Sequence, residues 1–600
     1  MLKKFFLVVC GSFVGAILAF TFLMISSIIM SFAIFGSMSK VQTQSVDKNS
    51  ILHIQLTGEL VERTVEQDPF AMYAPGSMLM GSSEQISLQE LVAAIDNAKT
   101  NDKIKGIYIE CEGVGAAPAS LMALRKALVD FKNSKKFIYA YGNEGISQGD
   151  YYVASVADSI FLHPEGAVDL HGLSSQTPYF KTLLENVGVQ MQVIRVGRFK
   201  SAVEPYMLDS ISPENREQQE LYLGKIWEEM STAIATDRHI AVEKVNQLAD
   251  SICAMMSAQE LMNEKLVDKL CYKEEFEDKL RAISELDPED DLKLVQPAAI
   301  AGDLNEKGSG SDKIVVLYAV GEIDGSASIV GGATDGIYSE DLVATLRELR
   351  LDEDVKGLVL RVNSPGGSAF GSEVIWKALD DFKKSGRTVA VSMGDYAASG
   401  GYYISCNADR IFAEPTTITG SIGIFGVIPC YRQLAEDKLG VHFSTVSTNA
   451  NGTFGSTMEP LTPYQRDALQ RMVNRGYDTF TRRCADGRHV SQDSIKAIAE
   501  GRVWDAKTAK EIGLVDEFGG INDAVKWVAK KAGLNEDKYT VVVAPNYEMS
   551  FWSMMANAQA RTTRNQMRNQ MGMFYDSYEM LERIMNRDRV LCIMEPIEIR

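Results

Sequence analysis

Histidine and cysteine are scarce in this 600-residue chain, and their scarcity argues against several kinds of site. None of the six histidines lies in a segment typical of a catalytic loop, so the sequence gives no support to a Ser-His-Asp triad. The eight cysteines show neither CxxC nor Cys/His ligand spacing, so we predict no metal site and no obligatory disulfide. Basic residues are outnumbered by acidic ones, and the net charge of -19 argues against a nucleic-acid-binding protein.

Charge is absent from one long stretch near the N-terminus. After Lys3 and Lys4, no charged residue occurs in residues 5–39, whereas a membrane-spanning helix needs only about 20 apolar residues. The run is also longer than the apolar region of a cleaved signal peptide, so we predict an uncleaved transmembrane anchor within residues 1–45. The positive-inside tendency places Lys3 and Lys4 in the cytoplasm and the bulk of the chain across the membrane.

The rest of the chain contains an internal duplication. The segment KIKGIYIECEG is similar to DVKGLVLRVNS, and pairing Gly106 with Gly357 sets an offset of 251 residues. The same offset continues without a gap and pairs Tyr151 with Tyr402, Asp158 with Asp409, Pro164 with Pro415 and Gly172 with Gly423. Agreement over such a span indicates two homologous domains that arose by duplication.

We place the two domains at residues 46–282 and 313–545. Between them, residues 283–312 are rich in charge, Gly, Ser and Pro, which is typical of a linker. The Met- and Arg-rich tail, 546–600, is either an amphipathic partner-binding helix or a disordered end. Within the second domain, the strand-like runs LVLRV and TVAVSM flank the helical pattern EVIWKALDDFKK, so we predict an α/β fold with parallel strands in each repeat.

Two glycine-rich loops follow successive predicted strands in the second repeat. In RVNSPGGSAFGSE, Gly366 and Gly367 are predicted to present backbone N–H groups at a helix start, as an oxyanion hole requires; a tight turn without a ligand is the alternative. In SMGDYAASGGYYIS, Ser399 is either a helix N-cap or an exposed nucleophile. Because the carboxyl ends of neighbouring parallel strands meet at one sheet edge, the pair of loops favours a shared site.

A serine nucleophile needs a base, and a lysine can serve if it is held neutral. Lys200, in VIRVGRFKSAVEPYM, has apolar neighbours such as Phe199 and is our candidate. The duplication offers an independent argument, because Ser399 corresponds to Gln148 in the first repeat at the same offset. After a one-residue insertion that pairs Gly188 with Gly440, Lys200 corresponds to Gly452 in the second. Each repeat keeps half of a Ser/Lys dyad, which is the pattern that one composite active site would leave.

The segments RVNSPGGS, AASGGYY, ITGSIGI and GRFKSAVEP together resemble the signal peptide peptidase A family, also called protease IV, of the long, duplicated bacterial type. The resemblance implies a crotonase-like (Clp-type) fold in both repeats and a homo-oligomer, typically a tetramer, on the outer face of the cytoplasmic membrane. It implies Ser399 as the nucleophile, Lys200 as the base, Gly366 or Gly367 as the oxyanion donor, and no cofactor. Ser421, in TGSIG, is a possible accessory residue that hydrogen-bonds near the lysine.

The predicted function is therefore that of a membrane-anchored serine endopeptidase that degrades released signal peptides through an acyl-enzyme. Two alternatives stay open. One is an acyl-CoA hydratase or isomerase on the same fold, which would need a catalytic Glu or Asp near the loops. The other is a non-catalytic membrane scaffold, in which Ser399 only caps a helix.

Overall fold

A computed structural model describes residues 46–64, 85–324, 336–535, 538–545 and 590–594. The predicted anchor within residues 1–45 and most of the tail lie outside these described residues. Within the part that is described, no helix has both the length and the apolar character needed to cross a membrane. The chain divides into two units, residues 1–48 and 49–600, and the second contains both repeats.

The first repeat is built on a parallel sheet with the strand order β10-β7-β5-β4-β1-β11. Its strands are β10 (Lys269–Leu270), β7 (Ser159–Leu162), β5 (Phe137–Gly142), β4 (Ile104–Cys111), β1 (Ser50–Leu56) and β11 (Leu294–Val295). The helices around it include α2 (Leu88–Thr100), α3 (Pro118–Phe131), α4 (Gln148–Ala154) and α9 (Lys273–Ile283). The predicted α/β class with parallel strands is confirmed.

The second repeat has a larger sheet with the order β12-β24-β13-β16-β18-β19-β23. Its strands are β12 (Glu306–Gly308), β24 (Tyr539–Ala544), β13 (Asp312–Val320), β16 (Val355–Ser364), β18 (Thr388–Ala398), β19 (Arg410–Ala413) and β23 (Glu517–Phe518). Strand β20 (Ile418–Gly420) pairs with the end of β18, and β22 (Val503–Asp505) pairs with β20. Strands β16, β18 and β19 begin 251 residues after β4, β5 and β7, so the duplication seen in the sequence is also present in the fold.

The predicted strand-helix-strand unit is present as β16, α12 (Ala369–Lys384) and β18. Strand β16 is buried along most of its length, as a central parallel strand covered on both faces must be. In α12, Ile375, Leu379 and Phe382 are buried at helical spacing. The helix begins where the Ser368 hydroxyl accepts the Gly371 N–H at 3.1 Å.

Residues 283–312 do more than connect the repeats. Strand β11 lies parallel to β1 and extends the first sheet, whereas β12 pairs antiparallel with β24 in the second. The composition of this segment predicted a linker because it offers little apolar surface, but backbone hydrogen bonds to exposed sheet edges need no apolar side chains. The segment therefore completes both sheets while it joins them.

A long helix recurs in both repeats and marks the duplication as clearly as the sheets do. Helices α6 (Pro213–Arg238) and α14 (Pro463–Arg488) are each 26 residues long. They end at His239 and His489, which adopt left-handed conformations with φ of 54° and 56°. Such matching ends indicate that the two repeats keep the same backbone well beyond the central strands.

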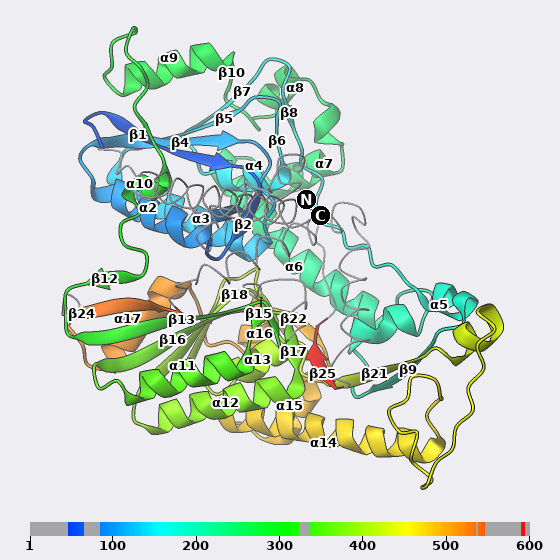
Figure 1. The fold of residues 1–600 in the computed structure, drawn as a ribbon. Helices are drawn as coiled ribbons and strands as arrows, with labels where there is room; N and C mark the ends of the chain where they lie inside the picture. Colours follow the sequence, from blue (N-terminus) through cyan, green and yellow to red (C-terminus); the bar gives the residue numbers. More distant parts are fainter. Residues whose placement is uncertain (1–45, 65–84, 325–335, 536–537, 546–589, 595–600) are drawn as a thin grey trace, which may run out of the picture. The chain divides into compact units, whose positions relative to one another are not determined.

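A third sheet combines strands of both repeats with one strand from the tail. Its order is β15-β14-β17-β25-β21-β9 (Figure 1). The strands are β15 (Gly336–Ile337), β14 (Glu322–Ile323), β17 (Gly366–Ser368), β25 (Leu591–Ile593), β21 (Phe425–Cys430) and β9 (Gln190–Arg195). Strand β9 of the first repeat runs antiparallel to β21 of the second. The segment that follows β9 therefore begins next to residues of the second repeat.

Candidate active site

Ser399 lies at the junction between β18 and helix α13 (Gly400–Ser405). Its backbone has φ 55° and ψ -112°, a conformation that a residue with a side chain adopts only under strain. The side chain makes no capping hydrogen bond to α13, so the N-cap interpretation does not describe what the hydroxyl does. Instead, Ser399 Oγ lies 2.8 Å from the Nζ of Lys200.

Lys200 reaches this serine from the loop after β9, just before the short 3-10 helix η4 (Ser201–Tyr206). The residue is 1 % exposed, and Phe199, Ala202 and Val203 beside it are also buried. Its Nζ lies 3.0 Å from Ser421 Oγ and 3.1 Å from the Ser421 carbonyl oxygen. Burial of a lysine disfavours its charged ammonium form.

The structure thus brings together Lys200, Ser399 and Ser421, which the sequence placed as much as 221 residues apart. Ser421 follows β20, which pairs with the end of β18 so that Ala398 lies opposite Gly420. The Ser399 N–H donates to the Gly420 carbonyl at 2.8 Å. This pairing fixes Ser421 beside the nucleophile and allows it to contact the amine from the other side.

A loop that sequence reasoning missed holds the lysine in place. Gly501 has φ +79°, and a Cβ added there would lie 2.6 Å from the Lys200 Cβ and 2.8 Å from its backbone nitrogen. The Phe199 N–H donates to the Glu500 carbonyl at 3.0 Å, and the Gly501 N–H donates to the Ile422 carbonyl at 2.9 Å. Gly501 could not be recognised from the sequence, because glycine is needed there only for close backbone packing and not for any side-chain chemistry.

The two glycines of the other loop are not equivalent. They do not open the helix as predicted; they form strand β17 with Ser368, and α12 starts after them. The Gly366 N–H already donates to Ser364 Oγ at 3.2 Å, whereas Gly367 is paired with Cys592 of β25. The loop runs extended because the positive φ angles of Gly366 and Gly367, +109° and +151°, are not helical. The Gly366 amide is therefore engaged within its own loop, whereas Gly367 lies opposite the tail strand β25.

The corresponding region of the first repeat is closed by its own side chains. Asp150 accepts the Gly113 N–H at 2.8 Å and the Val114 N–H at 3.0 Å. By the repeat offset, Gly113 and Val114 correspond to Ser364 and Pro365 of the second repeat. Burial raises the pKa of this carboxyl to about 6.

Gln148, the counterpart of Ser399, also bonds within its own repeat. Its side-chain oxygen accepts the N–H groups of His171 and Gly172, both at 2.9 Å. The groups that could form a second site are therefore used internally, and the described residues bring together one Ser/Lys pair.

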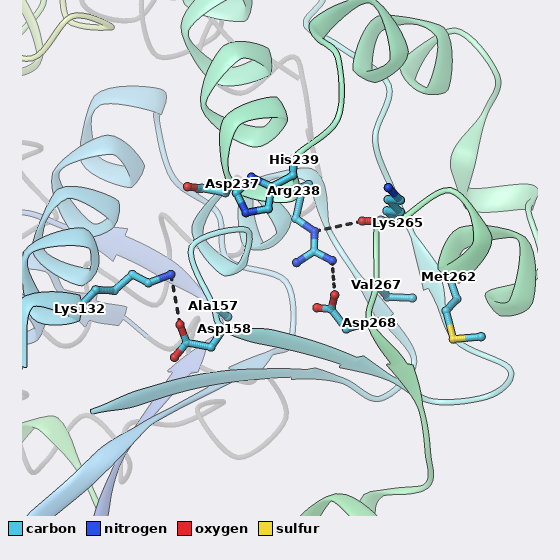
Figure 2. Close-up of a pocket in the computed structure, with 10 residues that line it drawn as sticks. All are labelled: Lys132, Ala157, Asp158, Asp237, Arg238, His239, Met262, Lys265, Val267 and Asp268. Atoms are coloured by element: carbon cyan, nitrogen blue, oxygen red, sulfur yellow. Dashed lines mark hydrogen bonds and ion pairs between the residues drawn. The ribbon is translucent and has the colours of Figure 1, made fainter. Parts of the chain in front are cut away.

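A cavity of about 440 Å³ lies elsewhere in the first repeat (Figure 2). Its charged side chains largely pair with one another, as in the Lys132–Asp158 contact of 3.2 Å and the Arg238–Asp268 contact of 2.8 Å. None of the ten side chains drawn in Figure 2 belongs to the Lys200–Ser399 pair or to the glycine loop. We do not assign this cavity to the site.

Comparisons with known proteins agree with the duplicated architecture. The sequence profile of peptidase family S49 matches residues 130–287 and 381–535, one stretch in each repeat. Protease 4 of Salmonella typhi is 38% identical over 488 residues, which cover 77% of this chain and 75% of that protein. Protease 4 of Haemophilus influenzae is 34% identical over 465 residues, covering 76% and 74%. The chloroplastic serine protease SPPA of Arabidopsis thaliana is 27% identical over 510 residues, covering 83% and 72%.

Proposed function

Because this chain belongs to peptidase family S49 and is a serine protease, we propose that Ser399 is its nucleophile and Lys200 its general base. The observation that carries this proposal is the 2.8 Å contact between the Lys200 Nζ and the Ser399 Oγ. The two groups come from different repeats, and both are buried. The acyl-CoA and scaffold alternatives do not fit membership of a peptidase family.

In the proposed mechanism, neutral Lys200 donates its two N–H groups to the Ser421 carbonyl and hydroxyl oxygens. Its lone pair then faces the Ser399 hydroxyl and accepts that proton as Oγ attacks a peptide carbonyl. The amides of Gly367 and Gly400 hold the oxyanion, and Lys200 returns the proton to the leaving amine. Water hydrolyses the resulting ester. Ser421 thereby serves as a positioning residue for the amine.

A fluorophosphonate probe tests the nucleophile directly. We expect the probe to label Ser399, found by mass mapping of the labelled peptide, because in the proposed mechanism the lone pair of the amine faces this hydroxyl. Ser399→Ala should neither label nor hydrolyse peptides. Ser385→Ala is the matched control and should label normally, because this hydroxyl lies after α12 and bonds only locally: it donates to the Phe382 carbonyl and accepts from Arg387. Labelling at another residue, or full activity in Ser399→Ala, would refute the assignment.

The sequence supports a finer proposal for location and substrate. The uncharged run after Lys4 favours a single-pass anchor in the bacterial cytoplasmic membrane, with the catalytic repeats, 46–282 and 313–545, on the extracytoplasmic side as a homotetramer of crotonase-like domains. An enzyme held there would meet the apolar signal peptides released after secretion. We expect the protein to stay in carbonate-washed membranes and to degrade apolar signal peptides faster than charged peptides of equal length. Extraction by carbonate, or a preference for charged peptides, would count against this proposal.

A further inference from the structure

The first repeat places a buried carboxylate beside two central strands of the second. This is Glu62, which follows strand β2 (Glu59–Val61). The guanidinium of Arg361, in β16, donates to it through Nε at 3.1 Å to each carboxylate oxygen and through Nη2 at 2.7 Å to Oε1. The same guanidinium donates through Nη1 to Ser392 Oγ at 2.9 Å and to the Met393 carbonyl at 2.7 Å, both in β18. Arg361 therefore links the first repeat to β16 and β18.

Strands β16 and β18 lie side by side (Figure 1), but their register is interrupted next to this carboxylate. The pairing passes from Val362 and Met393 directly to Ser364 and Ala397. Asn363 alone therefore lies opposite three residues of β18, which is a β-bulge with two extra residues. A bulge bends the strand that carries it and changes the direction of the side chains beyond it. This one lies between the regular part of the sheet and the proposed nucleophile.

Each residue of the bulge contacts Glu62 or Asn363. A Cβ added to Gly394 would lie 2.6 Å from Glu62 Oε1, so the carboxylate packs directly on this backbone. Asn363 Nδ2 donates to Glu62 Oε1 at 3.2 Å and to Asp395 Oδ2 at 3.1 Å. The Tyr396 N–H donates to Asn363 Oδ1 at 3.1 Å. The carboxylate and the amide together therefore hold all three bulge residues.

The first repeat also holds the bulge through helix α3. Ser120, in the first turn of α3, donates its N–H to Asp395 Oδ1 at 2.8 Å and its hydroxyl to Asp395 Oδ2 at 2.7 Å. The Asp395 carboxylate thus accepts two hydrogen bonds from the first repeat and one from Asn363. The conformation of β18 just before the nucleophile is therefore fixed by groups from both repeats.

The corresponding position of the first repeat carries the opposite charge. At the offset of 251 residues, Arg361 corresponds to Glu110. Glu110 is also buried, but its carboxylate contacts His53 Nε2 at 2.9 Å and Lys273 Nζ at 2.6 Å, both within the first repeat. The two repeats share the strand but differ in its charged residue. The Arg361 contacts, like Ser399 itself, therefore belong to the repeat that carries the nucleophile.

We propose that Glu62 and Asn363 are positioning residues for the peptidase reaction, an inference that rests on the function proposed above. They hold the bulge, and the bulge sets where β18 places Ser399 Oγ relative to the glycine loop that follows β16. Both residues act through the backbone of β18 and not on the substrate. The first repeat thereby supplies the base, Lys200, and also a group that places the nucleophile of the second.

Glu62→Gln in the full-length protein tests this proposal. Glutamine keeps the size of the side chain but loses the charge and one of the two acceptor oxygens that face Arg361 and Asn363. We expect kcat for one peptide to fall by about 10²-fold, the cost of a misplacement of roughly 1 Å, with KM nearly unchanged. The rate of fluorophosphonate labelling at Ser399 should fall with kcat. Both rates are measured well below the melting temperature of the variant, so that they report geometry and not unfolding.

Asn363→Ala is a second variant that leaves no buried charge without its partner. It removes the hydrogen bonds across the bulge but keeps the Glu62–Arg361 pair, so it should lose kcat in the same way and decides the question if Glu62→Gln does not fold. Glu110→Gln is the matched control, because Glu110 and Glu62 are both 5 % exposed. Its loss should lower the melting temperature but leave kcat and KM unchanged.

Three results would overturn the positioning role. They are wild-type kcat in a folded Glu62→Gln or in Asn363→Ala, a raised KM at unchanged kcat, and a loss of kcat in Glu110→Gln equal to that in Glu62→Gln. The last would show that kcat follows stability alone. Labelling of the wild type separates this inference from the proposed function. A wild type that labels at Ser399, with variants that keep its kcat, overturns this inference alone, whereas a wild type that does not label overturns both.

Discussion

Replacing Lys200 with methionine is expected to lower kcat/KM for peptide hydrolysis by a factor on the order of 10⁴ to 10⁶, the range found when one member of a catalytic pair or triad is removed. Methionine has a similar length and suits the buried environment of Lys200, so the fold should survive; what disappears is the amine 2.8 Å from Ser399 Oγ. Peptide hydrolysis and the rate of fluorophosphonate labelling should fall together, because both need an activated hydroxyl.

The matched control is Lys307→Met. The Lys307 side chain is 78 % exposed and pairs only with Asp96 at the surface, so its loss should leave both rates unchanged. Melting temperatures of both variants should be measured alongside. Full activity in Lys200→Met would remove this residue from the mechanism, and an equal loss of activity in Lys307→Met would show that the assay reports something other than the dyad.

Much of the site could be predicted because the chain contains two homologous repeats, which can be compared with each other position by position. The offset of 251 residues places Gln148 opposite Ser399. After a one-residue insertion, it places Gly452 opposite Lys200, and neither difference is required by folding. The strands that carry these residues also have strong local signals, since central parallel strands such as β16 read as apolar runs. The parallel α/β fold and family membership followed from the same patterns.

What could not be predicted depends on contacts between backbones that are distant in sequence. Nothing in the segment around Gly501 signals that its Cα packs against Lys200, because glycine is equally common in turns that touch nothing. The choice between Gly366 and Gly367 likewise depends on one hydrogen bond, from the Gly366 N–H to Ser364 Oγ. The periodicity of apolar residues indicates which face of a helix or strand is buried. It does not indicate which backbone amide is left free of an internal hydrogen bond and able to bind a ligand.

The tail strand was missed for a related reason. Residues Leu591–Ile593 form a strand of three residues, too short to show alternation, and their partners β17 and β21 are not continuous in sequence. The glycine-rich sequence of β17 also suggested a turn before a helix. The position of β25 between β17 and β21 becomes apparent only when these two strands are located in the same sheet.

Gly367→Ala is expected to lower kcat by roughly 10²- to 10³-fold, the cost of losing one oxyanion donor. A Cβ at Gly367 would lie 2.1 Å from the Ile323 carbonyl oxygen and 2.6 Å from its nitrogen. These are backbone atoms of the neighbouring strand β14, so β17 must move and carry the amide away from the reacting carbonyl. The measurement is kcat and KM for one peptide, with fluorophosphonate labelling of Ser399 as a second readout.

Gly386→Ala separates this effect from the general cost of placing alanine at positive φ. Gly386 follows α12 with φ +89°, and a Cβ there would have no atom within 4 Å. The change should cost about 1 kcal/mol of stability and leave kcat unchanged, because strain at this turn does not reach the site. If both variants lost activity equally, the loss in Gly367→Ala would reflect weakened folding. If Gly367→Ala kept wild-type kcat, the amide of Gly367 would not be the donor, and the oxyanion would have to be held by Gly400 with another group.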